Sequence, residues 1–216
     1  MSLMKKALII LAIVAVIAAI LLFLSVKKIY TPTTGDRIAK YDNPAKALLV
    51  IDVQEDYTGL FGKEPPLFMN VDAQIGTINK LIDSASKSGM QIAYIRQIFD
   101  NNYLTRKFIG RTIDGLPGTE IDKRVRVVNN NDFTKKISDA FSNPQLEAFL
   151  INNHVDELYL VGLDAAYCVY YTALGALNRG YKVTVIEDAL MTRKSMPDIL
   201  KRYNKDGIAI IRSEDL

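Results

Sequence analysis

The chain of 216 residues carries 27 basic and 24 acidic side chains, one cysteine and one histidine, and 49% of its residues are hydrophobic. A single cysteine excludes an intrachain disulfide and a cysteine-based zinc site, and a single histidine excludes a multi-histidine metal site. Setting aside the four lysines that flank an apolar N-terminal run leaves 23 basic residues against 24 acidic ones, so the body offers no basic field for nucleic acid.

Residues 7–26 form an uninterrupted apolar run with a pair of lysines on each side. As a helix rising about 1.5 Å per residue, this run is roughly 30 Å long, which matches the hydrocarbon core of a bilayer. We interpret residues 1–28 as a single-pass membrane anchor, with a cleaved signal segment and a buried core helix as the alternatives. The flanking charges leave the membrane side of the body open. Residues 29–44 contain two prolines and a glycine and are predicted to be a linker.

From residue 45 onward, short apolar runs alternate with amphipathic stretches, which we assign to one domain, residues 45–216. The apolar runs are rich in Val, Ile and Leu and predict six strands, at residues 47–51, 91–95, 125–128, 158–163, 182–186 and 208–211. Helical spacing and capping residues predict helices at residues 71–88, 144–152, 168–178 and 195–204.

Strands that alternate with helices indicate the α/β class. We expect a doubly wound, mostly parallel six-stranded sheet with helices on both faces, a Rossmann-like three-layer sandwich preceded by one hydrophobic helix. Ligands of such sheets bind beyond the carboxyl ends of the strands. Three reactive residues are predicted at this edge. Asp52 directly follows the first strand, Lys135 lies in the connection after the third, and Cys168 begins the helix after the fourth.

These three residue types are sufficient for nucleophilic catalysis without histidine. A thiol attacks as its thiolate, which a helix N-terminus and a nearby ammonium favour. A carboxylate can take the thiol proton and later return it to a leaving amine. The same residues also have an ordinary interpretation, with Cys168 as a small buried apolar residue and Asp52 and Lys135 as caps or solvated charges. Spacing alone leaves both interpretations open.

Four segments resemble motifs of the isochorismatase-like cysteine hydrolases, a family that includes the nicotinamidases. In chain order they are LLVIDVQEDYTG at 48–59, GLPGTEI at 115–121, KKISDAFSNPQLEAFL at 135–150 and LYLVGLDAAYCVYYTALGALNRGYKVTVIEDA at 158–189. The first resembles the family's opening motif and the last its nucleophile motif. The likeness covers nearly all of residues 45–216, and each motif lies at a predicted strand end.

The resemblance implies an Asp-Lys-Cys catalytic triad. Asp52 matches the residue that serves as general base and then general acid, and Cys168 matches the nucleophile. Lys135 matches the lysine, with the adjacent Lys136 as the alternative register.

The resemblance also implies a cis peptide bond between Leu163 and Asp164. In the family this bond directs backbone N–H groups toward the oxyanion of the substrate, and the donors here would be the amides of Asp164 and Cys168. Gln97, Phe99 and Phe133 are candidates for the pocket lining, with exposed or core-packing roles as the alternatives.

The chain departs from the family pattern at three places. Ala165 and Ala166 stand where many members have Thr-Asp, and Asp164 stands where a small apolar residue is more usual. Metal-dependent nicotinamidases carry histidines after the second strand, whereas residues 96–108 contain none. The resemblance therefore implies a member without metal or cofactor that acts on a different substrate.

The leading hypothesis is hydrolysis of a small amide or related C–N bond through a Cys168 thioester. The alternatives are isochorismatase-type vinyl ether cleavage, whose enzymes generally lack the cysteine, and a catalytically inactive membrane-attached binding or scaffold protein. The expected partners are a small-molecule amide and, through the N-terminal helix, a membrane. Because homo-oligomers are common in the family, self-association is a further expectation.

Overall fold

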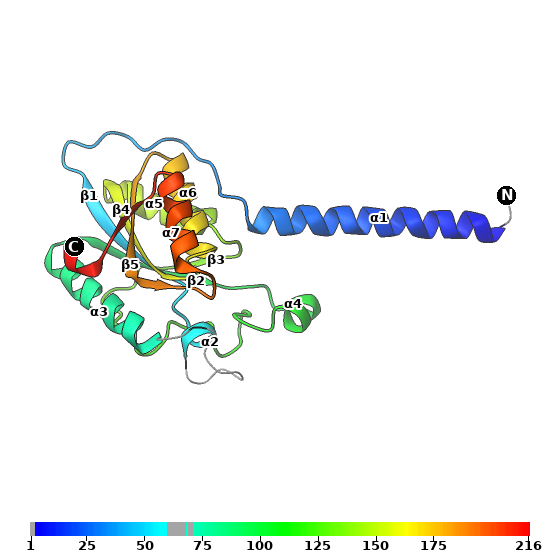
Figure 1. Cartoon of the computed structure of the whole chain (residues 1–216), viewed down its shortest axis with the longest axis horizontal. Helices are drawn as coiled ribbons and strands as arrows, with labels where there is room; N and C mark the ends of the chain where they lie inside the picture. Colours follow the sequence, from blue (N-terminus) through cyan, green and yellow to red (C-terminus); the bar gives the residue numbers. More distant parts are fainter. Residues whose placement is uncertain (1–2, 60–67, 69–70) are drawn as a thin grey trace.

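The structure, a computed structural model, describes residues 3–59, 68 and 71–216. A long helix, α1 (Leu3–Ile29), projects from the body that holds the strands (Figure 1). The side chains of residues 4–6 and 8–28 are exposed, and the helix is long and apolar enough to cross a membrane by length and composition. Residues 30–44 contain no helix or strand and connect α1 to the body.

The body is built on one sheet whose strands all pair in parallel, in the order β3-β2-β1-β4-β5-β6. The strands are β1 (Ala45–Ile51), β2 (Gln91–Gln97), β3 (Asp132–Lys135), β4 (Val155–Leu163), β5 (Lys182–Met191) and β6 (Ala209–Ile211). The strand order reverses at the central pair, β1 and β4, which is the arrangement of a doubly wound sheet. The predicted fold class is therefore confirmed.

Helices cover both faces of the sheet. One face packs against α3 (Val71–Lys87), and the other packs against α5 (Pro144–Asn152), α6 (Cys168–Asn178) and α7 (Met196–Lys205). The shorter elements among the described residues are α2 (Glu55–Thr58), α4 (Tyr103–Phe108) and the 3-10 turns η1 (Ala140–Ser142) and η2 (Ser213–Asp215).

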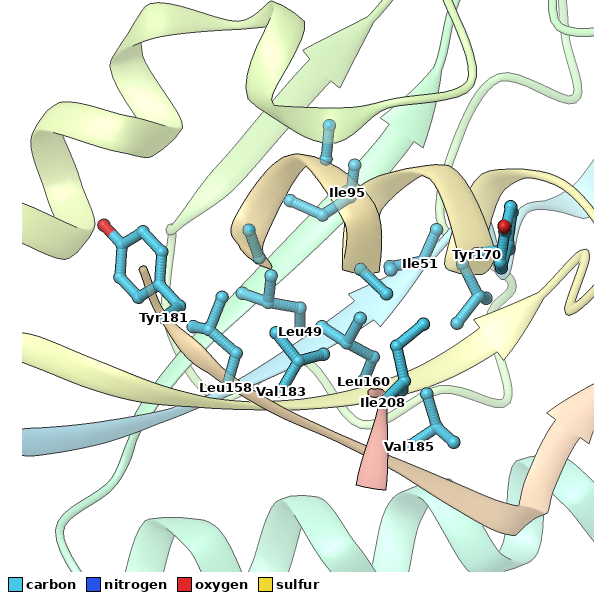
Figure 2. Close-up of a cluster of buried hydrophobic side chains, with 14 of the residues drawn as sticks. Leu49, Ile51, Ile95, Leu158, Leu160, Tyr170, Tyr181, Val183, Val185 and Ile208 are labelled. Atoms are coloured by element: carbon cyan, nitrogen blue, oxygen red, sulfur yellow. The ribbon is translucent and has the colours of Figure 1, made fainter. Parts of the chain in front are cut away.

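The two faces of the central strands form two separate hydrophobic clusters. Leu49 and Ile51 of β1 point into the cluster under α6, whereas Leu48 and Val50 point into the cluster against α3. This alternation is the period of two expected of a strand, and all four side chains are apolar because both faces are covered. Figure 2 shows the first cluster, with side chains of β1, β4 and β5 gathered beneath α6.

The predicted third strand is wrong. Residues 125–128 form no strand, and β3 is instead the polar segment Asp132–Lys135 paired with β2. Side chains hold the earlier stretch in place, since the Tyr94 hydroxyl donates to the Arg126 carbonyl and accepts from the Val128 amide. The apolar run of residues 125–128 was misleading because only Val125 of its three valines is buried.

A glycine brings the two central strands unusually close together. Gly162 of β4 lies opposite Ile51 of β1 and has a φ of 106°, which residues with a side chain rarely adopt. A Cβ atom at this position would lie 2.2 Å from the Ile51 carbonyl oxygen. Close contact between these strand ends therefore requires glycine.

Candidate active site

The carboxylate of Asp52 is buried at the carboxyl end of β1. Its residue is 1% exposed and has a φ of 55°, a left-handed conformation that Asp tolerates better than most residues. The Asp52 amide donates to the Ile95 carbonyl of β2 at 2.8 Å, which fixes the turn that follows the strand. One carboxylate oxygen, Oδ1, is buried without a hydrogen-bond partner among the described residues.

Lys135 is the last residue of β3. The sequence had predicted it in the connection after the third strand, and this placement is wrong. Its side chain is fully buried, and its ammonium donates three hydrogen bonds. The acceptors are Asp52 Oδ2 at 2.8 Å, Gln97 Oε1 at 2.7 Å and Cys168 Sγ at 3.2 Å. All three N–H groups of the ammonium therefore have partners, and the ammonium connects the carboxylate to the sulfur.

Cys168 is the first residue of α6, directly beyond the loop that follows β4. It is only partly buried, so its sulfur is accessible from the cavity described below. Helix N-termini carry positive potential, which favours an anion at this position. The arrangement thus brings together a thiol, an ammonium and a carboxylate from three strand ends of one sheet edge.

The net effect of burial and of the charges in this cluster is to raise the pKa values of both Cys168 and Lys135. Burial and the negative charge of Asp52 raise the pKa of Cys168 to about 12, and the Lys135 ammonium offsets only part of this rise. Burial opposes the charge on Lys135, but attraction to Asp52 and Cys168 raises its pKa above the ordinary value. The resting cluster therefore pairs a thiol with a lysine ammonium at neutral pH.

The loop between β4 and α6 begins with a cis peptide bond between Leu163 and Asp164. Asp164 Oδ1 accepts a hydrogen bond from the Ala166 amide at 2.8 Å, and burial raises the pKa of Asp164. Within the described part of the chain, neither the Asp164 amide nor the Cys168 amide donates a hydrogen bond to a protein group. Two backbone donors thus remain available beside the sulfur.

A cavity of about 260 Å³ opens beside the cluster. Asp52 and Cys168 contribute its reactive groups, and Arg193 contributes the one basic side chain among its described lining residues. Most of the remaining lining is apolar or aromatic, and comes from Ile29, Tyr30, Tyr57, Phe68, Phe99, Leu163 and Tyr167. The cavity therefore presents a thiol and a carboxylate within a largely apolar enclosure.

The candidate pocket residues separate into two groups. Gln97 and Phe99 line the cavity, whereas Phe133 packs against Phe149 of α5, with ring centroids 5.4 Å apart, and belongs to the core. Phe133 lies on the same face of β3 as Lys135, but it is two residues farther from the carboxyl end of the strand, where it packs against α5. Lys136, the alternative triad lysine, is exposed and pairs with Asp100 at 2.5 Å.

Gln97 has a role that sequence reasoning missed. Besides accepting from the Lys135 ammonium, it donates from Nε2 to the Lys135 carbonyl at 3.0 Å. Gln54 in turn holds Gln97, accepting from its amide at 2.8 Å and donating to its carbonyl at 3.1 Å. The only sequence signal for these roles was position, because Gln54 follows β1 closely and Gln97 ends β2.

Potential metal ligands are not clustered among the described residues. Across the described ranges, no group of three or more His, Cys, Asp or Glu side chains is placed to hold a metal ion. The single histidine, His154, directly precedes β4 at the amino end of the strand and stacks on Tyr41 with ring centroids 4.9 Å apart. This imidazole lies at the opposite end of the sheet from Cys168.

The chain matches a known family and curated relatives within it. Residues 46–214 match the isochorismatase domain. The chain is 29% identical over 147 residues to an uncharacterised isochorismatase family protein of Bacillus subtilis (strain 168), covering 68% of this chain and 77% of that protein. It is 26% identical over 178 residues to the nicotinamidase of Escherichia coli (strain K12), covering 67% and 82%.

Solved structures agree with this assignment. The N-carbamoylsarcosine amidase of Thermoplasma acidophilum matches with a TM-score of 0.68 and 26% identity, over 80% of this chain and 98% of that one. The pyrazinamidase of Pyrococcus horikoshii, solved in complex with zinc, matches with a TM-score of 0.68 and 25% identity, over 78% and 99%. The family match over most of the chain, together with the sheet and the site at its carboxyl edge, establishes that this chain belongs to the isochorismatase family of hydrolases.

Proposed function

We propose that the chain is a metal-independent amidase that cleaves the C–N bond of a small amide through a thioester on Cys168. The observation that carries this proposal is the Lys135 ammonium, which donates to both Asp52 and Cys168 at the wall of one cavity. The amidase names of the relatives in the family support the same reaction class.

The first step is attack of sulfur on the amide carbonyl carbon. Because the pKa of Cys168 is raised to about 12, its proton must leave as the C–S bond forms. Asp52 takes this proton, and its unpartnered Oδ1 is the oxygen free to accept it. Lys135 keeps its proton throughout and stabilises the negative charge that develops on the sulfur.

The carbonyl oxygen becomes an oxyanion in the tetrahedral intermediate. In this proposal the backbone amides of Asp164 and Cys168 donate hydrogen bonds to that oxygen. Both amides lack other acceptors among the described residues, and the Cys168 amide lies at the start of α6, where the helix dipole favours negative charge.

The remaining steps return the site to its starting state. Protonated Asp52 donates to the leaving nitrogen as the C–N bond breaks, which releases an amine or ammonia and leaves the acyl group on Cys168 as a thioester. Water then attacks the thioester carbon and gives a proton to Asp52. The C–S bond breaks, the carboxylic acid leaves, and Asp52 returns the proton to the sulfur.

Mass spectrometry of the intact chain tests this scheme. A starting panel contains nicotinamide and N-carbamoylsarcosine, the amides that relatives are named for, and simple alkyl amides. A substrate should add its acyl mass to the wild-type chain during turnover and add nothing to Cys168→Ala. Turnover by Cys168→Ala at the wild-type rate would rule out the covalent route.

We also infer that α1 holds the protein in a membrane by a single pass. The helix is apolar throughout its middle, the described side chains of residues 8–26 are exposed, and its last turn carries Lys27 and Lys28, which suit the headgroup layer. Carbonate extraction should leave the full-length chain in the membrane pellet. Release of a chain that lacks its first residues would instead identify a cleaved signal segment.

A further inference from the structure

The C-terminal end of α1 forms part of the wall of the catalytic cavity. Ile29, its last residue, and Tyr30 both line the cavity that contains Cys168. The Tyr30 ring packs against Tyr167 and Tyr171, with centroids 5.5 Å and 5.9 Å away. The point where the apolar helix leaves the body is therefore also an edge of the active site.

The segment after α1 is bound tightly to the body. The amide and hydroxyl of Thr33 both donate to Asp139 Oδ2 at 2.7 Å. Arg179 donates to the Thr33 hydroxyl at 3.0 Å and to the Thr34 carbonyl at 3.2 Å, and both Asp139 and Arg179 are buried. A flexible tether of about 15 residues would have an end-to-end distance of roughly 20 Å, so the body could take many positions relative to the helix. Here the hydrogen bonds fix the direction of the cavity relative to the helix.

A second apolar surface projects on the same side of the body. Helix α4 protrudes from the body on the side from which α1 leaves (Figure 1). Tyr103, Leu104 and Phe108 of α4 are 72%, 63% and 74% exposed, and Arg106 and Lys107 lie among them. Exposed aromatic and aliphatic side chains beside basic ones suit the headgroup layer of an anionic bilayer. Because α1 already brings the bilayer to this side, we take the membrane as the occupant of the α4 surface.

We propose, building on the amidase function above, that the substrate is an amphipathic amide dissolved in the membrane. Its amide group would reach Cys168, and its alkyl chain would leave the cavity past Ile29 and Tyr30 into the bilayer. A cavity of about 260 Å³ is smaller than those that enclose a drug-sized molecule, so only the amide end needs to fit inside. The apolar lining near α1 matches an alkyl chain and offers little to a strongly hydrated substrate.

Alkylation of Cys168, the only cysteine, tests this proposal without a known substrate. The full-length chain is placed in nanodiscs of phosphatidylcholine and phosphatidylglycerol, which leave both membrane sides open. It is then labelled with iodoacetamide or with N-dodecyl iodoacetamide. The dodecyl probe should label Cys168 faster by roughly tenfold or more, measured against a free thiol peptide anchored in the same discs. Double substitution Leu104→Ser/Phe108→Ser should reduce this preference several-fold.

Ile151→Ser is the matched control, because it removes an exposed apolar side chain near the amino end of β4 and should leave the preference unchanged. Equal labelling by both probes in wild type would overturn the inference. So would an effect of the α4 substitutions that persists in detergent without lipid, which would show that α4 acts on the cavity itself and not through the bilayer. Asp52→Asn separates the two proposals. If it leaves labelling by both probes unchanged, the amidase mechanism itself fails.

Discussion

The buried cluster around Asp52 and the buried cluster around Asp139 differ in how completely their hydrogen bonds are satisfied. In the first, Asp52 gives one oxygen to Lys135 and leaves the other without a partner in the described structure. In the second, Asp139 accepts from the Thr33 amide and hydroxyl with one oxygen and from the Phe141 amide with the other. Both carboxylates are 1% exposed or less.

The basic residues of the two clusters differ in the same way. Arg179 donates to Glu147, to Thr33 and Thr34 and to the Gly175 carbonyl, all of which are structural acceptors. Lys135 directs one of its three bonds to a sulfur that borders a cavity. Burial alone therefore does not distinguish a reactive cluster from a structural one. The unpaired carboxylate oxygen and the accessible sulfur do, and four predictions test this distinction.

Cys168→Ala should have the largest effect on activity. It removes the nucleophile, so kcat/KM on any verified substrate should fall by roughly 10³-fold or more. Because the side chain is small and only partly buried, thermal unfolding should be nearly unchanged. The measurement pairs a turnover assay with a melting curve on one preparation. A large drop in melting temperature would show that Cys168 acts mainly in packing.

Asp52→Asn should separate thiol reactivity from turnover. The charge of Asp52 raises the pKa of Cys168, so removing that charge lowers this pKa and increases the thiolate fraction at a given pH. Iodoacetamide should then label the variant faster than wild type between about pH 7 and 10. The increase of the labelling rate with pH should begin at a lower pH in the variant than in wild type. Turnover should nevertheless fall by about 10²- to 10⁴-fold because the proton acceptor is gone. Retained turnover would remove Asp52 from the mechanism.

Arg179→Met should lower stability and leave the intrinsic reactivity of Cys168 unchanged. It leaves buried acceptors of the second cluster without their donor, which should cost about 3 kcal/mol in the free energy of unfolding. Denaturant unfolding in detergent measures this loss. The rate at which iodoacetamide labels Cys168 in the folded protein should match wild type, since Arg179 donates to none of the three reactive residues. A change in labelling as large as that of Asp52→Asn would erase the distinction between the clusters.

Gln97→Met should have the smallest effect. It removes one of three acceptors of the buried Lys135 ammonium and should reduce kcat by roughly tenfold, the scale of a hydrogen bond to a charged group. Phe99→Leu is the control, since Phe99 also lines the cavity but belongs to no hydrogen bond of the cluster. If both variants lose activity equally, Gln97 acts only as part of the wall.

Local sequence patterns located two of the three clustered residues. Asp52 and Cys168 adjoin strongly apolar strands, β1 and β4, whose ends can be read from composition. Lys135 lies on a strand that its sequence hides, because β3 is short, polar and at the edge of the sheet. Lys135 was expected at this edge only because a strand was predicted at residues 125–128, which form none, and its role came from the family resemblance. Its inward direction follows from a buried ion pair that no local pattern encodes.

The attachment of α1 could not be predicted for a different reason. The residues after it suggested a linker because they contain prolines and a glycine. Their hydrogen bonds reach Asp139 and Arg179, which lie more than a hundred positions away along the chain. Such contacts depend on the folded body and leave no periodicity in the segment itself.

The missing side chain at Gly162 determines how far apart the acid and the thiol lie. Asp52 directly follows Ile51, the strand residue that faces this glycine, and Cys168 lies six residues after Gly162. Even a methyl group at this position would push β1 away from β4. The Asp52 carboxylate and the Cys168 thiol, which exchange the proton, would then move apart as well. Libraries that vary the cavity to change substrate preference should therefore leave this backbone position untouched, since no rotamer adjustment nearby can restore the spacing.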